Sequence, residues 1–208
     1  ISHTHYVMPP IGLGYLAAAL RRGGFDEVVI LDCVKEGLSF NGFRGFLERI
    51  KPRIVGFQIF SYDFDSVVKS IEIVKQLNHE TKVLIGGAHV SATSALALEE
   101  IKQADYGFVG EGEIGLPMLA GRLLRDEQIP LENIPGLIWR ENSSIRENAR
   151  TGVEDLDSLG FQPWDLMPPA SYPDNPQGGF YKRFPIAPIS TTRGCPYLCT
   201  FCGSGVNM

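Results

Sequence analysis

Short apolar runs alternate with helical patterns over the first half of the chain. Runs rich in β-branched and aromatic residues predict strands at 27–32, within 53–60, at 82–85 and at 106–109. Helical patterns lie around and between them, at 11–22, 43–50, 66–77, 94–102 and 115–124. Because the runs are continuously apolar, the strands should be covered on both faces. The order predicts an α/β fold, with a Rossmann- or flavodoxin-like parallel sheet and helices on both faces.

One element of such a fold is hard to find in the sequence. A sheet of this type normally begins with a strand that lies at its centre, before the first helix. Residues 1–8 show no clear apolar period, and His3 and His5 are interpreted as loop residues. We therefore expect that residues are missing, either upstream of Ile1 or before Pro9.

The pattern changes after residue 130. Residues 135–148 predict a β-hairpin with a polar turn. Residues 155–188 are rich in proline and aromatic residues and predict an ordered connector, since flexible linkers are rarely so apolar. Residues 186–191 predict one strand that leads into a cysteine-rich loop. These observations divide the chain into 1–130, 131–185 and 186–208.

Three cysteines in that loop indicate a metal centre. Cys195, Cys199 and Cys202 have the spacing C-x3-C-x2-C, and thiolates in such runs hold iron–sulfur clusters. Three ligands would leave one iron of a four-iron cluster open. Zinc sites usually take four ligands in two pairs, and a disulfide would leave an odd thiol, so both alternatives are less favoured. The fourth cysteine, Cys33, is interpreted as a small buried hydrophobe.

A second site is predicted at the carboxyl ends of the strands, where ligands bind in open parallel sheets. Glycines there let a large ligand approach the backbone, although they also simply turn a strand into a helix. Small or polar residues follow three successive predicted strands: Ser61, Tyr62, Gly86, Gly87, His89, Gly110, Glu111, Gly112 and Glu113. Their position on one edge favours a shared ligand site.

Composition excludes some classes of function. The chain has 208 residues, of which 44% are hydrophobic, and its formal net charge is -5. An acidic balance argues against a nucleic-acid partner held by its phosphates. We find no apolar run of about 18 residues, so no membrane span is expected. Thiols available as ligands fit a reducing cytoplasm.

The cysteine loop resembles the cluster motif of the radical S-adenosylmethionine superfamily. The resemblance lies in the cysteine spacing, in Phe201 before the last cysteine, and in the lead-in ISTTRGCPYLC at 189–199. It implies a 4Fe-4S cluster on Cys195, Cys199 and Cys202, whose open iron binds S-adenosylmethionine. It further implies an external electron donor, because a reduced cluster cleaves S-adenosylmethionine to methionine and a 5′-deoxyadenosyl radical.

The first half resembles the cobalamin-binding domain of one class of that superfamily. The residues concerned are PPIGLGYLAAAL at 9–20, Gly-Gly-Ala-His at 86–89 and Gly-Glu-Gly-Glu at 110–113. The usual cobalamin motif D-x-H-x-x-G is absent, since Asp32 is followed by Cys33, so cobalt should lack a His ligand from it. His89 has three interpretations: a cobalt ligand, a helix cap, or a partner of a corrin amide.

This resemblance implies an enzyme that methylates carbon or closes a ring oxidatively on a small-molecule substrate, as tetrapyrrole cyclases do. The barrel expected after Cys202 is missing, so we expect a fragment that is inactive alone. A transfer RNA methylthiotransferase is a less favoured alternative, because those enzymes hold a second cluster on three N-terminal cysteines. The alternative without catalysis is a small-molecule-binding or redox-sensing module.

Overall fold

The computed structural model describes residues 7–174, 181–197 and 199–202, so His3 and His5 lie outside the described residues. Contacts divide the chain into two compact units, each discontinuous in sequence. Residues 42–154 and 194–208 form the sheet unit, and residues 1–41 and 155–193 form the helix–connector unit. The domain boundaries predicted at residues 130 and 185 stay predictions.

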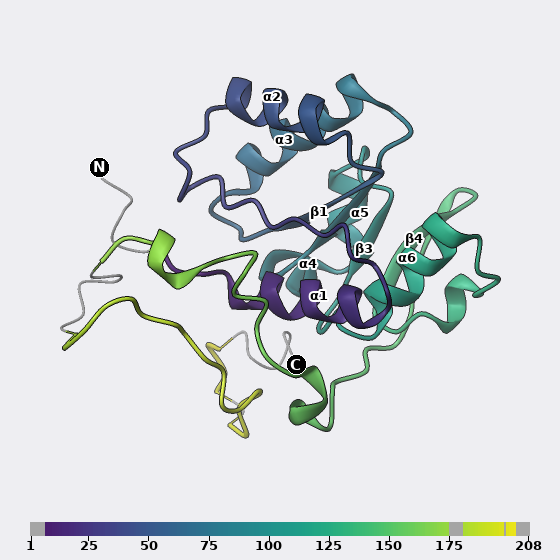
Figure 1. Ribbon diagram of the computed structural model, residues 1–208. Coiled ribbons are helices and arrows are strands. Elements are labelled where there is room, and N and C mark those ends of the chain that lie inside the picture. Colours follow the sequence, from purple (N-terminus) through teal and green to yellow (C-terminus); the bar gives the residue numbers. More distant parts are fainter. Residues whose placement is uncertain (1–6, 175–180, 198, 203–208) are drawn as a thin grey trace. The chain divides into compact units, whose positions relative to one another are not determined.

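The sheet unit is built on a five-stranded sheet with the strand order β1-β2-β3-β4-β5 (Figure 1). Its strands are β1 (Ile54–Gln58), β2 (Lys82–Gly86), β3 (Tyr106–Phe108), β4 (Leu137–Glu141) and β5 (Ser144–Glu147). The first three strands pair in parallel, and β4 and β5 add an antiparallel hairpin. The parallel strands therefore place their carboxyl ends at one edge, as the sequence predicts.

One α-helix precedes the first strand of the sheet unit, and four α-helices lie between its strands. They are α2 (Phe40–Ile50), α3 (Phe64–Leu77), α4 (Ala88–Thr93), α5 (Ala95–Glu100) and α6 (Gly115–Arg125). Arg44 of α2 donates a hydrogen bond to the side chain of Gln76 of α3 at 2.7 Å, which joins these two helices. The helix predicted at 94–102 is confirmed as α5, whereas the sequence does not predict α4 before it. Ser94, with a φ of 54°, ends α4 and separates the two helices.

Helices cover both faces of the sheet, which confirms the predicted fold class. On one face Leu84, Phe108 and Trp139 pack with Leu119 of α6 in a buried cluster. Side chains alternate between faces along a strand, so Arg140 points to the face opposite Trp139. There its guanidinium donates to the carbonyl of Ile101 at 3.3 Å, directly after α5.

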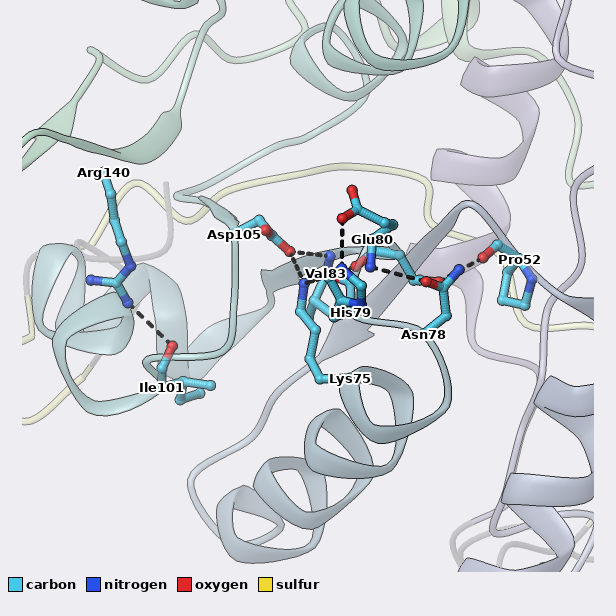
Figure 2. A network of polar contacts seen from close by, with 10 residues as sticks. Pro52, Lys75, Asn78, His79, Glu80, Val83, Ile101, Asp105 and Arg140 are labelled. Carbon is cyan, nitrogen blue, oxygen red and sulfur yellow. Dashed lines mark hydrogen bonds and ion pairs between the residues drawn. The ribbon is translucent and has the colours of Figure 1, made fainter.

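An ion pair holds the amino-terminal edge of the sheet together (Figure 2). Lys75 Nζ at the end of α3 lies 2.7 Å from Asp105 Oδ2, just before β3. The same oxygen accepts the backbone N–H of Val83 at 2.7 Å, and Lys75 also donates to the carbonyl of Thr81 at 2.8 Å. Thr81 in turn donates its hydroxyl to the carbonyl of Pro52 at 3.0 Å. This polar network fixes the starts of three strands, at the edge opposite the candidate site.

The strand predicted at 27–32 does not form, and Val29 is 57% exposed. The prediction is wrong because β-branched residues favour an extended backbone, but a strand also needs a neighbour to bond with. Asp32 instead begins a turn, and its carboxylate accepts the N–H groups of Val34 and Lys35 at 3.1 and 3.0 Å. Cys33 in this turn is exposed, so its interpretation as a buried hydrophobe is also wrong.

Residues 186–191 also lack strand structure, and Ile189 is 73% exposed. No described segment pairs with them, so the predicted strand is wrong for the same reason. The strands predicted within 53–60, at 82–85 and at 106–109 are confirmed, as is the hairpin. Within the described residues no strand pairs with the outer edge of β1. The additional central strand stays a prediction.

The helix–connector unit contains α1 (Ile11–Arg22), which begins after Pro10 and ends at Gly23, as predicted. The connector packs against this helix. The contact is close at Gly14, where an added Cβ atom would lie 2.0 Å from Gln162 Oε1 and 2.2 Å from Met167 Cε, so these two side-chain ends would have to move. Two short 3-10 helices, Leu156–Leu159 and Pro169–Ser171, give the connector local structure.

Charged groups fasten the end of α1 to the connector. Arg21 makes a bidentate hydrogen bond to Asp165, with N···O distances of 2.9 and 2.7 Å. This hydrogen bond lowers the pKa of the Asp165 carboxyl below its ordinary value. Arg22 donates to the carbonyl of Leu159. These contacts tie part of the described connector to α1, and the order of the whole connector stays a prediction. No helix among the described residues is long and apolar enough to span a membrane.

Candidate functional site

The loop after β1 carries a hydroxyl–imidazole pair. Ser61 Oγ lies 3.0 Å from Nδ1 of His89, which is in the first turn of α4 after β2. One of the two groups donates and the other accepts, so the pair ties the ends of two neighbouring strands. The ring of Phe64, at the start of α3, packs on the imidazole with centroids 5.0 Å apart. The sequence predicts Ser61 and His89, but it gives no sign of Phe64.

The other imidazole nitrogen of His89 has no partner among the described residues. Nε2 is buried and makes no hydrogen bond within the part of the chain that the structure describes. A buried nitrogen of this kind costs free energy until a ligand or water bonds to it. His89 is therefore held in position by its neighbours, and one buried ring nitrogen is left without a partner among the described residues.

Asp63 shapes the same loop. Its carboxylate accepts the backbone N–H of Phe60 at 2.9 Å, and this closes a turn around Ser61. Burial raises the pKa of Asp63 above its ordinary value, while the backbone hydrogen bonds and the nearby His89 oppose the rise. The turn leaves Tyr62 86% exposed, with its ring stacked on Phe60 at a centroid distance of 5.5 Å.

Gly87, directly after β2, has a structural reason that the sequence does not show. Gly87 has a φ of 98°, and a Cβ atom there would lie 2.9 Å from both the N and the O of Ile59. The backbones are this close because Ile59 donates to the carbonyl of Gly86 at 2.8 Å and accepts from His89 N–H at 3.1 Å. Gly86 has more space, since its nearest atom would be the Phe108 carbonyl oxygen at 3.8 Å.

The loop after β3 joins the same edge. Gly110 has a φ of 75°, and its N–H donates to the hydroxyl of Ser91 in α4 at 3.0 Å. Glu111 Oε2 accepts the backbone N–H of Val153 at 2.6 Å. The carbonyl of Gly112 accepts the N–H of Leu116 at 2.8 Å and so begins α6.

Helix α4 thus links all three loops of the edge. Its His89 contacts the loop after β1, and its Ser91 contacts the loop after β3. Glu113 is half-buried just before α6, and Tyr62 points into solvent. The sequence does not identify Ser91, because a serine in a short helix has no distinctive pattern.

The cysteine loop is exposed where it is described. Cys195, Cys199 and Cys202 are all exposed, and the N–H of Cys202 donates to the carbonyl of Cys199 at 3.0 Å. Among the described residues no group of three His, Cys, Asp or Glu side chains is arranged to hold a metal ion. The cluster on these cysteines therefore stays a prediction, although three thiols in one short loop are the donors that it needs.

The residues at the strand ends fit cobalamin. Gly86 and Gly87 are partly exposed glycines at this edge, and Nε2 of nearby His89 is buried with no partner in the described part of the chain. A large ligand with many amide groups could bond to such atoms.

Comparison with known proteins agrees with this geometry. A family model described as the B12 binding domain matches residues 1–120. An uncharacterized methyltransferase of Pyrococcus horikoshii is 32% identical over 95% of this chain and 41% of its own length. The anaerobic magnesium-protoporphyrin IX monomethyl ester cyclase of Rubrivivax gelatinosus is 27% identical over 93% of this chain and 34% of its own length. The chain therefore spans less than half the length of these curated relatives.

Solved structures show the same fold. The radical S-adenosylmethionine methyltransferase TsrM from Kitasatospora setae, with tryptophan and an S-adenosylmethionine analogue bound, has a TM-score of 0.60 at 22% identity over 69% of this chain and 28% of its own. The cobalamin-dependent S-adenosylmethionine radical enzyme OxsB has a TM-score of 0.62 at 18% identity, over 71% of this chain and 20% of its own. At these identities the likeness shows the fold, and together with the family match it leads to one conclusion: the chain belongs to the B12 binding domain family.

Proposed function

We propose that the carboxyl edge of the sheet unit holds cobalamin through the loops after β1, β2 and β3. The observation that carries this proposal is the fixed His89 imidazole, whose buried Nε2 has no described partner. The contact residues we propose are those predicted from the sequence: Ser61, Tyr62, Gly86, Gly87, His89, Gly110, Glu111, Gly112 and Glu113.

Each loop would have its own part. Gly86 and Gly87 are partly exposed and would offer their backbone groups to the ligand. Ser61 sets the orientation of His89, which bonds to an amide or other polar group of the ligand. Exposed Tyr62 offers an aromatic face to an apolar part of it. Cobalt would lack a His ligand from the D-x-H-x-x-G motif.

We further propose that the whole protein is a cobalamin-dependent radical S-adenosylmethionine enzyme. Cys195, Cys199 and Cys202 would hold a 4Fe-4S cluster, which supplies one-electron chemistry when an external donor reduces it. S-adenosylmethionine would be the co-substrate, and a small molecule would be methylated or closed into a ring. The names of the relatives support both reactions, since they include methyltransferases and a cyclase.

Retention of hydroxocobalamin tests the cofactor site. The wild-type chain, mixed with excess hydroxocobalamin and passed through a desalting column, should keep a pink chromophore. His89→Ala should weaken binding about 3- to 10-fold, which is the effect of one hydrogen bond. His79→Ala is the matched control, because His79 is an exposed histidine at the opposite edge. A wild-type chain that retains no cobalamin would contradict the proposal.

Reconstitution with iron and sulfide tests the cluster separately. The wild-type chain should bind iron and sulfide with the brown absorbance of a 4Fe-4S cluster, and Cys199→Ser should not. Cysteines that bind iron while the chain retains no cobalamin would favour an enzyme whose first domain serves recognition only. Cobalamin binding without a cluster would favour the small-molecule-binding module.

A further inference from the structure

The carboxylate of Glu111 is turned toward the backbone of a segment distant in sequence. Its Oε2 accepts the N–H of Val153 at 2.6 Å, within the range of charge-assisted hydrogen bonds. A Cβ atom added to the neighbouring Gly152 would lie 3.8 Å from the same oxygen. The carboxylate thus lies directly against the backbone of 152–153, which follows the β4–β5 hairpin.

Two further contacts hold this segment beside the β3 loop, which comprises residues 109–114 between β3 and α6. Gly136 N–H donates to the carbonyl of Ala149 at 3.0 Å. The aliphatic part of Arg150 lies over Gly110, where an added Cβ atom would be 3.4 Å from Arg150 Cδ. Residues 149–153 therefore run along the end of β3, and Gly110 and Glu111 contact them in succession.

The β3 loop is also fixed on its other side. The N–H of Gly110 is bonded to Ser91 of α4, the helix that presents His89. The loop is consequently clamped between α4 and residues 149–153. A shift of residues 149–153 would therefore change the conformation of the loop. Through Ser91 and α4 it would also change the orientation of the His89 side chain.

We propose that Glu111 is a positioning residue: its carboxylate fastens residues 150–153 to the carboxyl edge of the sheet and so holds the β3 loop in its ligand-binding shape. The ligand would then meet the backbone of 110–112 and not the carboxylate. This inference rests on the proposed cobalamin site for its functional part, but the fastening itself is independent of any ligand. The role requires a hydrogen-bond acceptor and does not require a negative charge.

Amide hydrogen–deuterium exchange of the ligand-free chain tests the fastening. In Glu111→Ala the amide of Val153 loses its acceptor and should exchange about 10- to 100-fold faster, the expected effect of one bond to a charged group. Glu111→Gln keeps an acceptor oxygen and should restore most of the protection. Glu113→Ala, in the same loop, is the control and should leave Val153 unchanged.

Three outcomes of the exchange experiment would overturn the proposal. In the first, the Val153 amide of Glu111→Ala exchanges at the wild-type rate. In the second, Glu111→Gln exchanges as fast as Glu111→Ala. In the third, Glu113→Ala loses as much protection at Val153 as Glu111→Ala. Because Glu111→Ala could disturb folding, Val153→Pro removes the donor from the other side. In the Val153→Pro background, Glu111→Ala should add no further exchange at residues 149–152, and an additive effect would contradict the bond.

Hydroxocobalamin retention tests the functional part. Glu111→Ala should retain the cofactor several-fold less well than the wild type, and Glu111→Gln should recover most of the affinity. Equal retention by wild type and Glu111→Ala, together with faster exchange, would disprove the effect of the fastening on the site. A wild-type chain that binds no cobalamin would instead disprove the proposed function, while the exchange result would still decide the fastening.

Discussion

Ser61 Oγ lies 3.0 Å from His89 Nδ1, and this contact joins the ends of two parallel strands. The two residues are far apart in sequence and meet because β1 and β2 pair in register, with Gln58 opposite Gly86. The contact explains why a serine and a histidine occupy these strand ends. It also leaves Nε2 as a buried nitrogen with no partner among the described residues.

Gly87→Ala should destabilise the sheet unit. A methyl group there would meet the Ile59 backbone at 2.9 Å, and the φ of 98° is unfavourable for any residue with a side chain. We expect a loss of about 1–3 kcal/mol in the free energy of unfolding, measured by urea denaturation.

Gly45→Ala in α2 is the matched control, because its added Cβ would contact nothing within 4 Å. Alanine should stabilise this helix by about 0.5–1 kcal/mol. If both substitutions had the same effect, the close approach of Gly87 to Ile59 would not matter for folding.

Asp105→Ala should weaken the amino-terminal edge of the sheet. It removes the partner of Lys75 and the acceptor for Val83 N–H, in a region where both charged side chains are largely buried. We expect a loss of about 2–4 kcal/mol in unfolding free energy. Glu80→Ala, which removes the exposed His79–Glu80 pair, should change it by less than about 0.5 kcal/mol. Equal losses in the two variants would contradict this assignment.

Acidification should loosen the connector from α1. The hydrogen bond from Arg21 lowers the pKa of Asp165 in the folded chain, so the folded state binds that proton less well than the unfolded state. The contribution is complete above the ordinary pKa of 3.8 and is lost as the pH falls through the lower folded value. Thermal unfolding of the wild type and of Asp165→Asn, measured from pH 6 down to pH 2, should converge at the acidic end. A constant difference across this range would argue against the pair.

The regular elements of the sheet unit follow from local sequence. The apolar run at 82–85 pairs on both sides, and its Val83, Leu84 and Ile85 are buried, so its composition predicts a strand. The same composition at 27–32 does not form one, because pairing depends on a neighbour that local sequence cannot specify. The sequence also does not predict α4, which precedes the predicted helix at 94–102 and is separated from it by Ser94 with a φ of 54°.

The candidate site was predictable as a set of strand ends but not as a network. Parallel pairing places Ser61, Gly87 and Gly110 at one edge, and the sequence shows where each strand stops. The links through Ser91, Phe64 and Val153 depend on the turns of α4 and on the return of the chain after the hairpin. No residue spacing in the sequence predicts those contacts.

Nuclear magnetic resonance of the ¹⁵N-labelled chain, titrated with diamagnetic hydroxocobalamin, tests the central claim most directly. The account predicts that backbone amides at the carboxyl edge, such as those of Ser61, Gly87 and Gly112, shift on binding. The chemical shifts of amides at the opposite edge, such as those of Thr81 and Asp105, should not change. Shifts confined to the opposite edge, or no shifts with saturating hydroxocobalamin, would contradict the assignment of this edge as the cobalamin site.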